Sequence, residues 1–205
     1  MRFPRTIIFV DLSGFTEYIE TRGDEAAVEL LHRFRRIGRD LAAELGVRID
    51  KFLGDGIMAS FGATSPSASH AADALRATEA LVVAADAWLE RLRREGIPLA
   101  GVGIGTASGS VVFGCIGDGA RLEYTVIGEA ANLASRLEKA TKAQAVPAIV
   151  LASTWDLALA QGYVPRAVAA ARRGIDVAGI DGPVDVVLLG RDPPGRPQAR
   201  LSDQS

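Results

Sequence analysis

The first strong pattern along the chain is a short apolar run that ends on a carboxylate. Residues 7–10 are Ile, Ile, Phe and Val, Asp11 follows them, and a Ser-Gly pair precedes a stretch with helical periodicity. A β-branched and aromatic run predicts a strand, and the Ser-Gly pair predicts a turn into a helix. We therefore expect Asp11 at the carboxyl end of the first strand.

Two longer amphipathic segments predict helices over residues 24–45 and over the alanine-rich residues 71–94. Between them, residues 47–53 and 57–61 have the composition of strands and are joined by a Gly-Asp-Gly turn. This spacing predicts a hairpin with Asp55 near its tip.

The second half continues with shorter elements. The pattern predicts a strand over 100–106, a turn at Ser108-Gly109, a partner strand over 111–116, a helix over about 129–142, a strand over 148–152, a short helix over 155–160 and a terminal strand pair within 174–189. The order strand, helix, hairpin, helix, strand pair predicts an α+β fold with a ferredoxin-like β-α-β-β-α-β core and additional C-terminal strands and helices. In that topology the first strand and the hairpin are neighbours, so Asp11 and Asp55 should converge.

The composition of the chain disfavours several classes of function. The chain has 205 residues and a formal net charge of −2, which gives no bulk basic character for binding nucleic acid. Its apolar runs are too short to cross a bilayer, and the N-terminus lacks the apolar stretch of a signal peptide, so we expect a cytoplasmic protein without a membrane partner. Residues 1–190 are expected to form one domain and residues 191–205, rich in Pro, Gly and polar groups, a disordered tail. Cys115 is the only cysteine, which excludes an intrachain disulfide and a cysteine metal cluster.

Two aspartates on rigid sheet elements suit a two-metal site for phosphoryl transfer. Oxygen ligands and phosphate favour Mg²⁺ or Mn²⁺ over zinc. The backbone amides at the start of the following helix, those of Gly14, Phe15 and Thr16, can bind the phosphates. Taken alone, an Asp at the end of a strand is more often a turn former or a helix cap than a metal ligand.

Asn132 and Arg136 are four residues apart and so project from one face of the predicted helix. An amide can orient a sugar, and a guanidinium can neutralise charge that develops on a phosphate. The alternative is ordinary surface polarity. For His32 and His70 we expect solvated or exposed positions rather than a catalytic role.

Three segments carry a resemblance to a known family. Residues 9–16 (FVDLSGFT), 51–58 (KFLGDGIM) and 124–138 (YTVIGEAANLASRLE) resemble the three signatures of class III nucleotidyl cyclase catalytic domains, in the family's order. The resemblance extends over about residues 5–189. It implies an adenylate cyclase that converts ATP to 3′,5′-cyclic AMP and pyrophosphate.

The resemblance also implies a role for each matching residue. Asp11 and Asp55 match the aspartates that bind two Mg²⁺ or Mn²⁺ ions per site, Lys51 and Thr125 the base-reading positions, Asn132 the ribose-orienting residue and Arg136 the residue that stabilises the transition state. Lysine at position 51 is typical of adenylate cyclases and glutamate of guanylate cyclases, while threonine at position 125 is similar to a bacterial subgroup. In the family the metal aspartates come from one subunit and the Asn-Arg pair from the other, which implies a homodimer with two shared active sites.

One position departs from the family pattern. Ala178 stands where the family commonly has a lysine that binds the terminal phosphates. Arg172 and Arg173, just upstream, are either substitutes for this charge or ordinary solvated side chains. The departure leaves open a catalytically weak or inactive domain that binds nucleotide or dimerises as a regulatory module. Lys51 disfavours a guanylate-specific enzyme, and the lack of clustered aromatics and of a basic stripe disfavours an RNA-binding module.

Overall fold

The computed structural model describes residues 3–62, 67–116 and 123–190. Within these residues the elements follow one another as β1 (Phe3–Ser13), α1 (Phe15–Arg22), α2 (Asp24–Glu44), β2 (Ile49–Leu53), β3 (Gly56–Phe61), α3 (His70–Arg94), β4 (Gly101–Ile116), β5 (Glu123–Gly128), α4 (Glu129–Gln144), β6 (Ala148–Leu151), α5 (Ala152–Ala160), β7 (Val168–Ile175) and β8 (Val184–Gly190). None of the helices in this part of the chain is both long and apolar enough to cross a membrane. The expected disordered tail, residues 191–205, lies outside the described residues.

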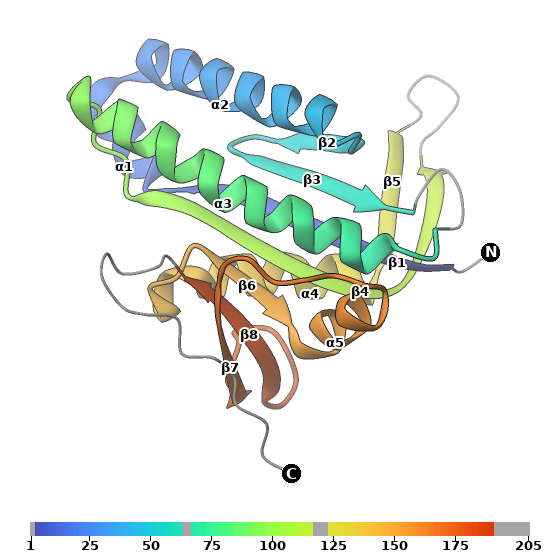
Figure 1. The fold of residues 1–205 in the computed structure, drawn as a ribbon. Helices are drawn as coiled ribbons and strands as arrows, with labels where there is room; N and C mark the ends of the chain where they lie inside the picture. The colour runs from blue at the N-terminus through green and yellow to red at the C-terminus, as the bar shows by residue number, and fades with distance from the viewer. Residues whose placement is uncertain (1–2, 63–66, 117–122, 191–205) are drawn as a thin grey trace.

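The strands form one sheet in the order β2-β3-β1-β4-β6-β8-β7, and β5 pairs with β4 (Figure 1). The first four strands in this order are antiparallel, as in the ferredoxin-like core. β6 then adds in parallel to β4, and β8 and β7 continue the sheet. The predicted α+β fold with a ferredoxin-like core and C-terminal additions is confirmed.

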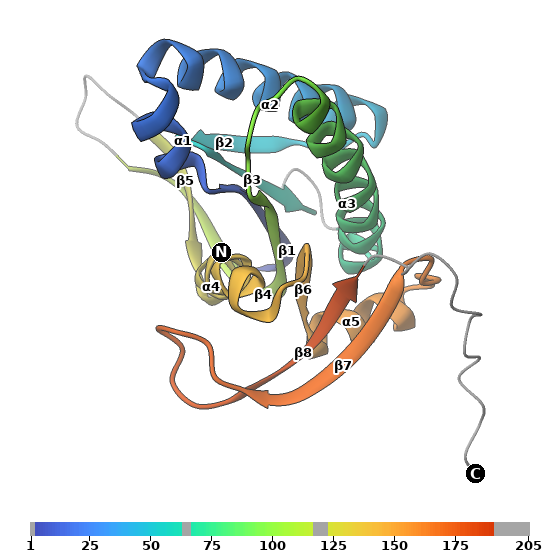
Figure 2. The same cartoon turned by 90° about the vertical axis from the view of Figure 1, so that its left-hand side faces the viewer.

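Side chains of β1 alternate between two apolar cores because successive residues of a strand face opposite sides of the sheet. Ile8, Val10 and Leu12 pack with α2 and α3, whereas Ile7 packs with α4. Two views show α2 and α3 over one face of the sheet and α4 on the other (Figure 1, Figure 2). Asp11 continues the alternation on the α4 side.

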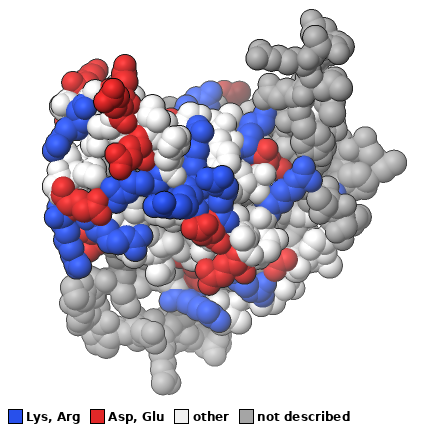
Figure 3. Space-filling view, turned by 90° about the horizontal axis from the view of Figure 1, so that it is seen from above, with Lys and Arg blue, Asp and Glu red and all other residues white. Residues whose placement is uncertain are grey.

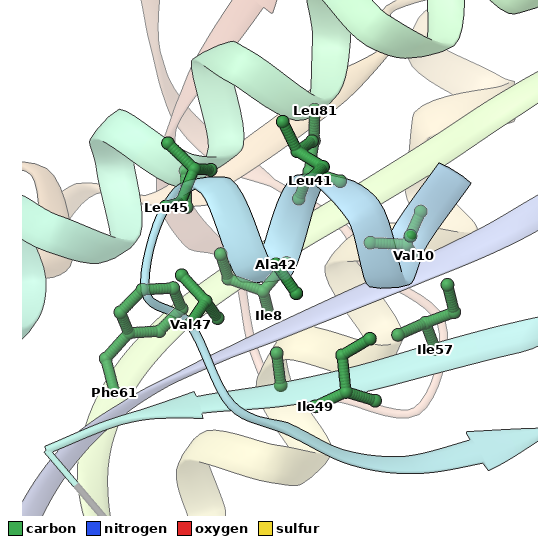
Figure 4. Close-up of a pocket in the computed structure, with 13 residues that line it drawn as sticks. Ile8, Val10, Leu41, Ala42, Leu45, Val47, Ile49, Ile57, Phe61 and Leu81 are labelled. Atoms are coloured by element: carbon green, nitrogen blue, oxygen red, sulfur yellow. The ribbon is translucent and has the colours of Figure 1, made fainter. Parts of the chain in front are cut away.

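The α2/α3 core contains a small apolar cavity of about 30 Å³. Its lining side chains, among them Val10, Ile57 and Leu81, are apolar (Figure 4). Because Val10 and Asp11 face opposite sides of the sheet, this cavity is separate from the carboxylates. On the outer surface of the same layer, which α2 covers, acidic and basic side chains lie interspersed, as on a solvated helix face (Figure 3).

The predicted turn at Ser108-Gly109 is wrong, because both residues lie inside the continuous strand β4. β1 pairs with β4 from Phe3 opposite Val111 to Ser13 opposite Gly101, and this long partner keeps β4 extended. A Cβ on Gly109 would stand 3.3 Å from Cβ of Ala130, so this glycine allows close approach of α4. The terminal strand pair is also longer than predicted, since β7 begins at Val168.

His70 is buried, against the expectation of an exposed position. Its Nδ1 lies 2.8 Å from Oγ1 of Thr6, and the same hydroxyl lies 2.7 Å from Oγ of Ser108. Burial, followed by the charge of Arg5, lowers the pKa of His70. This histidine therefore joins the start of α3 to β1 and β4 as a buried core residue.

Candidate active site

Asp11 lies near the end of β1 between two glycines on the neighbouring strands. Its partner in β3 is Gly56 and its partner in β4 is Gly103. A Cβ on Gly56 would stand only 3.1 Å from Oδ1 of Asp11. Because both partners are glycines, no side chain of a directly opposed strand residue stands beside the carboxylate.

Asp55 lies in the two-residue turn between β2 and β3, directly before Gly56. Burial raises the pKa of Asp11 to about 6, and the charge of Asp55 adds to this rise, while a backbone hydrogen bond at Leu12 and the charge of Lys139 oppose it. The structure thus brings the two carboxylates together at one end of the sheet, as the topology predicted.

A β-bulge determines the direction of Lys51. The pairing of β2 with β3 shifts between Ile49 and Lys51, so Lys51 lies opposite Met58, which belongs to the α4-side core. Ile49 and Phe52 pack instead against the α2/α3 core. Without the extra residue, strict alternation would give Lys51 the same side as Ile49. The bulge therefore turns Lys51 to the face of the sheet that carries Asp11.

The start of α1 contains the amides of Gly14, Phe15 and Thr16, which the sequence analysis expects to bind phosphate. Gly14 precedes the helix with φ +83°, and no side chain caps the N-terminus. The side chain of Phe15 is buried in the core, whereas Thr16 is exposed. Of Phe15, therefore, only the backbone is suited to contact a ligand.

Helix α4 presents Asn132 and Arg136 on an exposed face. Close contact with β4 fixes this helix, because a Cβ on Gly105 would stand 2.0 Å from the carbonyl oxygen of Ala134. The guanidinium of Arg136 lies against Gly179, in the loop between β7 and β8. Among the described residues, no hydrogen bond or ion pair joins Asn132 or Arg136 to the two aspartates. Within one chain Asn132 and Arg136 are therefore not joined to the two aspartates by a direct polar contact.

The other positions that the sequence analysis singled out are Ala178, Arg172, Arg173 and Thr125. Ala178 is exposed and directly precedes Gly179, beside Arg136. Arg172 and Arg173 are exposed residues of β7. Thr125 lies in β5 opposite Gly114, and its side chain, like that of Cys115, lies outside the described part.

Glu138 is a residue of this region that the sequence analysis did not single out. It lies in α4 and is 7% exposed. Burial, followed by the charge of Asp11, raises the pKa of Glu138 to about 7, Lys139 opposes this rise, and Asp55 adds to it. The available signal was its position, because Glu138 is the one charged residue on the buried face of α4, with Ala134, Leu137 and Thr141.

The chemistry of the donors fits a divalent cation that prefers oxygen. Asp11 and Asp55 supply carboxylate oxygens, the ligands of Mg²⁺ and Mn²⁺. Across the described ranges, no three His, Cys, Asp or Glu side chains form a group that could hold a metal ion. The pair therefore fits a hard cation that keeps further positions for water and phosphate.

The chain is similar to known proteins over most of its length. The family model described as adenylate and guanylate cyclase catalytic domain matches residues 4–166. An adenylate cyclase of Anabaena cylindrica is 38% identical over 144 residues, which is 67% of this chain and 27% of that protein. An uncharacterized protein of Mycobacterium tuberculosis is 34% identical over 189 residues, 92% of this chain and 32% of its own. The chain thus spans about a quarter to a third of the length of these curated relatives.

Two solved structures are similar over almost the whole chain. The adenylyl cyclase CyaB from P. aeruginosa has a TM-score of 0.77 at 29% identity, covering 95% of this chain and 97% of that chain. The guanylyl cyclase Cya2 has a TM-score of 0.77 at 30% identity, with 95% of each chain covered. The two neighbours are named for different nucleotides, so the choice of base depends on individual side chains rather than on the fold.

Proposed function

The chain belongs to the family of adenylate and guanylate cyclase catalytic domains, and we propose that it is an adenylate cyclase that converts ATP to 3′,5′-cyclic AMP and pyrophosphate. The convergence of Asp11 and Asp55 beside the start of α1 is the observation that carries this proposal. Carboxylates and helix-start amides together suit a metal-bound triphosphate.

In the proposed reaction the ribose 3′-hydroxyl attacks the α-phosphorus, the bond from this phosphorus to the bridging oxygen breaks, and pyrophosphate leaves. Two Mg²⁺ or Mn²⁺ ions, held by Asp11 and Asp55, would lower the pKa of the hydroxyl and neutralise phosphate charge. The backbone amides of Gly14, Phe15 and Thr16 would bind the phosphates.

Helix α4 would supply the other half of the site. Asn132 would align the ribose by hydrogen bonding, and Arg136 would stabilise the charge that develops on the transferring phosphoryl group. Because no hydrogen bond or ion pair joins these side chains to the aspartates within the described part of one chain, we propose a homodimer with two sites, each shared by both subunits. Exposure of Asn132 and Arg136 supports this arrangement.

Lys51 and Thr125 would select the base. An ammonium donates a hydrogen bond to the adenine N1 acceptor, whereas guanine presents an N1–H donor at the same place. The bulge that turns Lys51 to the face of Asp11 supports this role. The proposal is therefore ATP rather than GTP as substrate.

Ala178 favours a second candidate, a weakly active or inactive domain that binds nucleotide or dimerises as a regulatory module. The lost phosphate contact corresponds to about 1.5–3 kcal/mol for a charge-assisted hydrogen bond. We expect this loss to weaken substrate binding rather than to slow the chemical step. The missing lysine would bind the terminal phosphates, whereas other groups activate the hydroxyl.

The test is formation of cyclic nucleotide by the purified chain. ATP and GTP are compared in Mg²⁺ and in Mn²⁺ over a range of protein concentrations, with Asp55→Asn as the matched inactive variant. Cyclic AMP with a specific activity that rises with concentration is expected, and D55N should lose product without unfolding. Folded dimeric protein that makes no product would favour the regulatory module, and turnover by D55N would contradict the two-metal assignment.

A further inference from the structure

We propose that Glu138 is a positioning residue of the metal site, a third carboxylate that acts on the ion held by Asp11 and Asp55 without binding it directly. This inference rests on the proposed function, because it concerns the same ion. It adds a residue from α4 to a site otherwise formed by β1 and the β2–β3 turn.

The packing of α4 on β4 places the carboxylate of Glu138 beside Asp11. A Cβ on Gly103 would stand 2.6 Å from Oγ1 of Thr141 and 2.7 Å from Oε1 of Glu138, so these two side chains together fill the space over Gly103. Gly103 is the cross-strand partner of Asp11. Side chains of directly opposed residues in an antiparallel pair have Cβ atoms about 4.5–5.5 Å apart. Glu138 therefore occupies the position next to Asp11 that a side chain at residue 103 would otherwise fill.

The charge of Lys139 compensates that of Glu138 only in part. Among the described residues its carboxylate accepts no hydrogen bond and forms no ion pair, and the bond from Thr141 Oγ1 goes to its backbone oxygen. Lys139, the basic residue whose charge opposes that of Glu138, is exposed. A buried carboxylate beside another carboxylate is costly unless a cation or hydrogen bonds compensate it.

A divalent ion at Asp11 and Asp55 would supply the missing positive charge. No group of three His, Cys, Asp or Glu side chains in the described ranges could hold a metal ion. We therefore place Glu138 next to the ion's ligands rather than among them. Its carboxylate would accept a hydrogen bond from water on the ion and add negative potential. Residues in such a position typically change metal affinity about 10–100-fold.

The test measures Mn²⁺ binding by the full chain without nucleotide, from the electron paramagnetic resonance signal of free Mn²⁺. Glu138→Gln should weaken binding about 10-fold or more, and Glu138→Asp, which keeps the charge, should restore part of the loss. Glu129→Gln is the matched control, since this exposed glutamate lies in the same helix about 14 Å away along the axis. It should bind Mn²⁺ like the wild type.

A structural role of Glu138 gives a different result. If Glu138 only fixed α4 on the sheet, the amide variant would lower the unfolding midpoint of the metal-free protein and leave Mn²⁺ affinity unchanged, which would overturn the inference. We expect a midpoint equal to or above that of wild type, because a buried charge is removed. Should E138Q not fold, E138D carries the test, and unchanged affinity in E138D would overturn the inference.

The variant Asp11→Asn distinguishes a failure of the role of Glu138 from a failure of the proposed metal site. Loss of Mn²⁺ binding in D11N without loss in E138Q overturns the role of Glu138 alone. Equal binding by D11N and wild type contradicts the metal site of the proposed function, and with it this inference.

Discussion

The guanidinium of Arg136 lies so close to the backbone of Gly179 that no side chain fits between them. A Cβ on Gly179 would stand 2.5 Å from Cζ of Arg136. Gly179 also has φ +80°, a conformation that favours glycine. The loop between β7 and β8 therefore contacts the arginine through its backbone, next to Ala178, where the family resemblance led us to expect a lysine.

Substitution of Gly179 by Ala is expected to lower kcat strongly and the free energy of unfolding only modestly. The new methyl group would displace the guanidinium, and a displacement of about 1 Å in a catalytic group can cost about 100-fold in rate. Backbone strain alone should cost about 1–2 kcal/mol. Measurement of kcat, KM and the unfolding midpoint distinguishes the two effects.

Gly182→Ala is the matched control for this prediction. Gly182 lies in the same loop with φ +77° and has no neighbouring atom within 4 Å of the added Cβ. It should show the same loss of stability with little loss of turnover. Equal turnover losses in both variants would contradict a role for the Arg136 contact.

The metal-free protein is expected to lose stability as pH rises from about 5 to about 8. The folded pKa values of Asp11, about 6, and Glu138, about 7, are raised above the ordinary 3.8 and 4.5. In this window the folded state keeps protons that the unfolded state has released, so the free energy of unfolding falls as pH rises. Below the ordinary values and above about pH 8, these two groups contribute no further slope.

Urea unfolding in a chelator at pH 5, 6, 7 and 8 measures this dependence. Other groups also titrate, so the informative quantity is the difference between wild type and Asp11→Asn, which removes one carboxylate and should flatten the slope. Saturating Mn²⁺ should stabilise the wild type more at pH 8 than at pH 5, because bound metal and protons compete. A D11N profile parallel to that of wild type would contradict the prediction.

The convergence of Asp11 and Asp55 could be predicted from the sequence because a short local segment determines the position of each aspartate. An apolar run that ends on Asp defines a strand end, and Gly-Asp-Gly between two strands defines a hairpin tip. The ferredoxin-like order then makes them neighbours. Similarly, helical spacing predicted that Asn132 and Arg136 share one face of a helix, whereas their expected roles came from the family resemblance.

Features that depend on distant packing were not predictable in this way. Ser108-Gly109 has the composition of a turn, but pairing with β1 keeps it extended. His70 looked like an exposed helix start, and its burial depends on Thr6, far away along the chain.

The bulge before Lys51 and the position of Glu138 also depend on packing between segments that are distant in the sequence. The register shift depends on which side chains of β2 pack under α2 and α3. The space that Glu138 fills exists only because α4 lies against a glycine of β4. Neither relationship is visible from the periodicity of one segment.

Lys51→Glu is expected to shift the nucleotide preference from ATP toward GTP. The carboxylate would accept a hydrogen bond from guanine N1–H and leave adenine N1 without a donor. Loss of a hydrogen bond from a charged donor corresponds to about 1.5–3 kcal/mol, or roughly 10–100-fold in kcat/KM for ATP.

Cyclic nucleotide formation from ATP and GTP by wild type, K51E and the neutral Lys51→Gln checks this prediction. The glutamine variant should lose activity with ATP without a matching gain in preference for GTP. An unchanged ratio of kcat/KM values in K51E would show that Lys51 does not contact the base.

Gly105→Ala is expected to destabilise the fold and to abolish activity through α4. The added Cβ would stand 2.0 Å from the carbonyl oxygen of Ala134 and 2.3 Å from the backbone nitrogen of Glu138. Backbone atoms of a helix cannot move aside like the end of a side chain, so α4 would have to lift from the sheet. We expect a loss of about 3 kcal/mol or more in the free energy of unfolding.

Gly114→Ala tests whether any alanine in β4 would have this effect. Gly114 lies in the same strand, and a Cβ there meets no atom within 4 Å. Because glycine inside a strand costs about 0.5–1 kcal/mol relative to alanine, this variant should be as stable as wild type or slightly more stable. If urea unfolding gave equal losses for both variants, the close packing of α4 on Gly105 would not be what fixes the helix that carries Asn132 and Arg136.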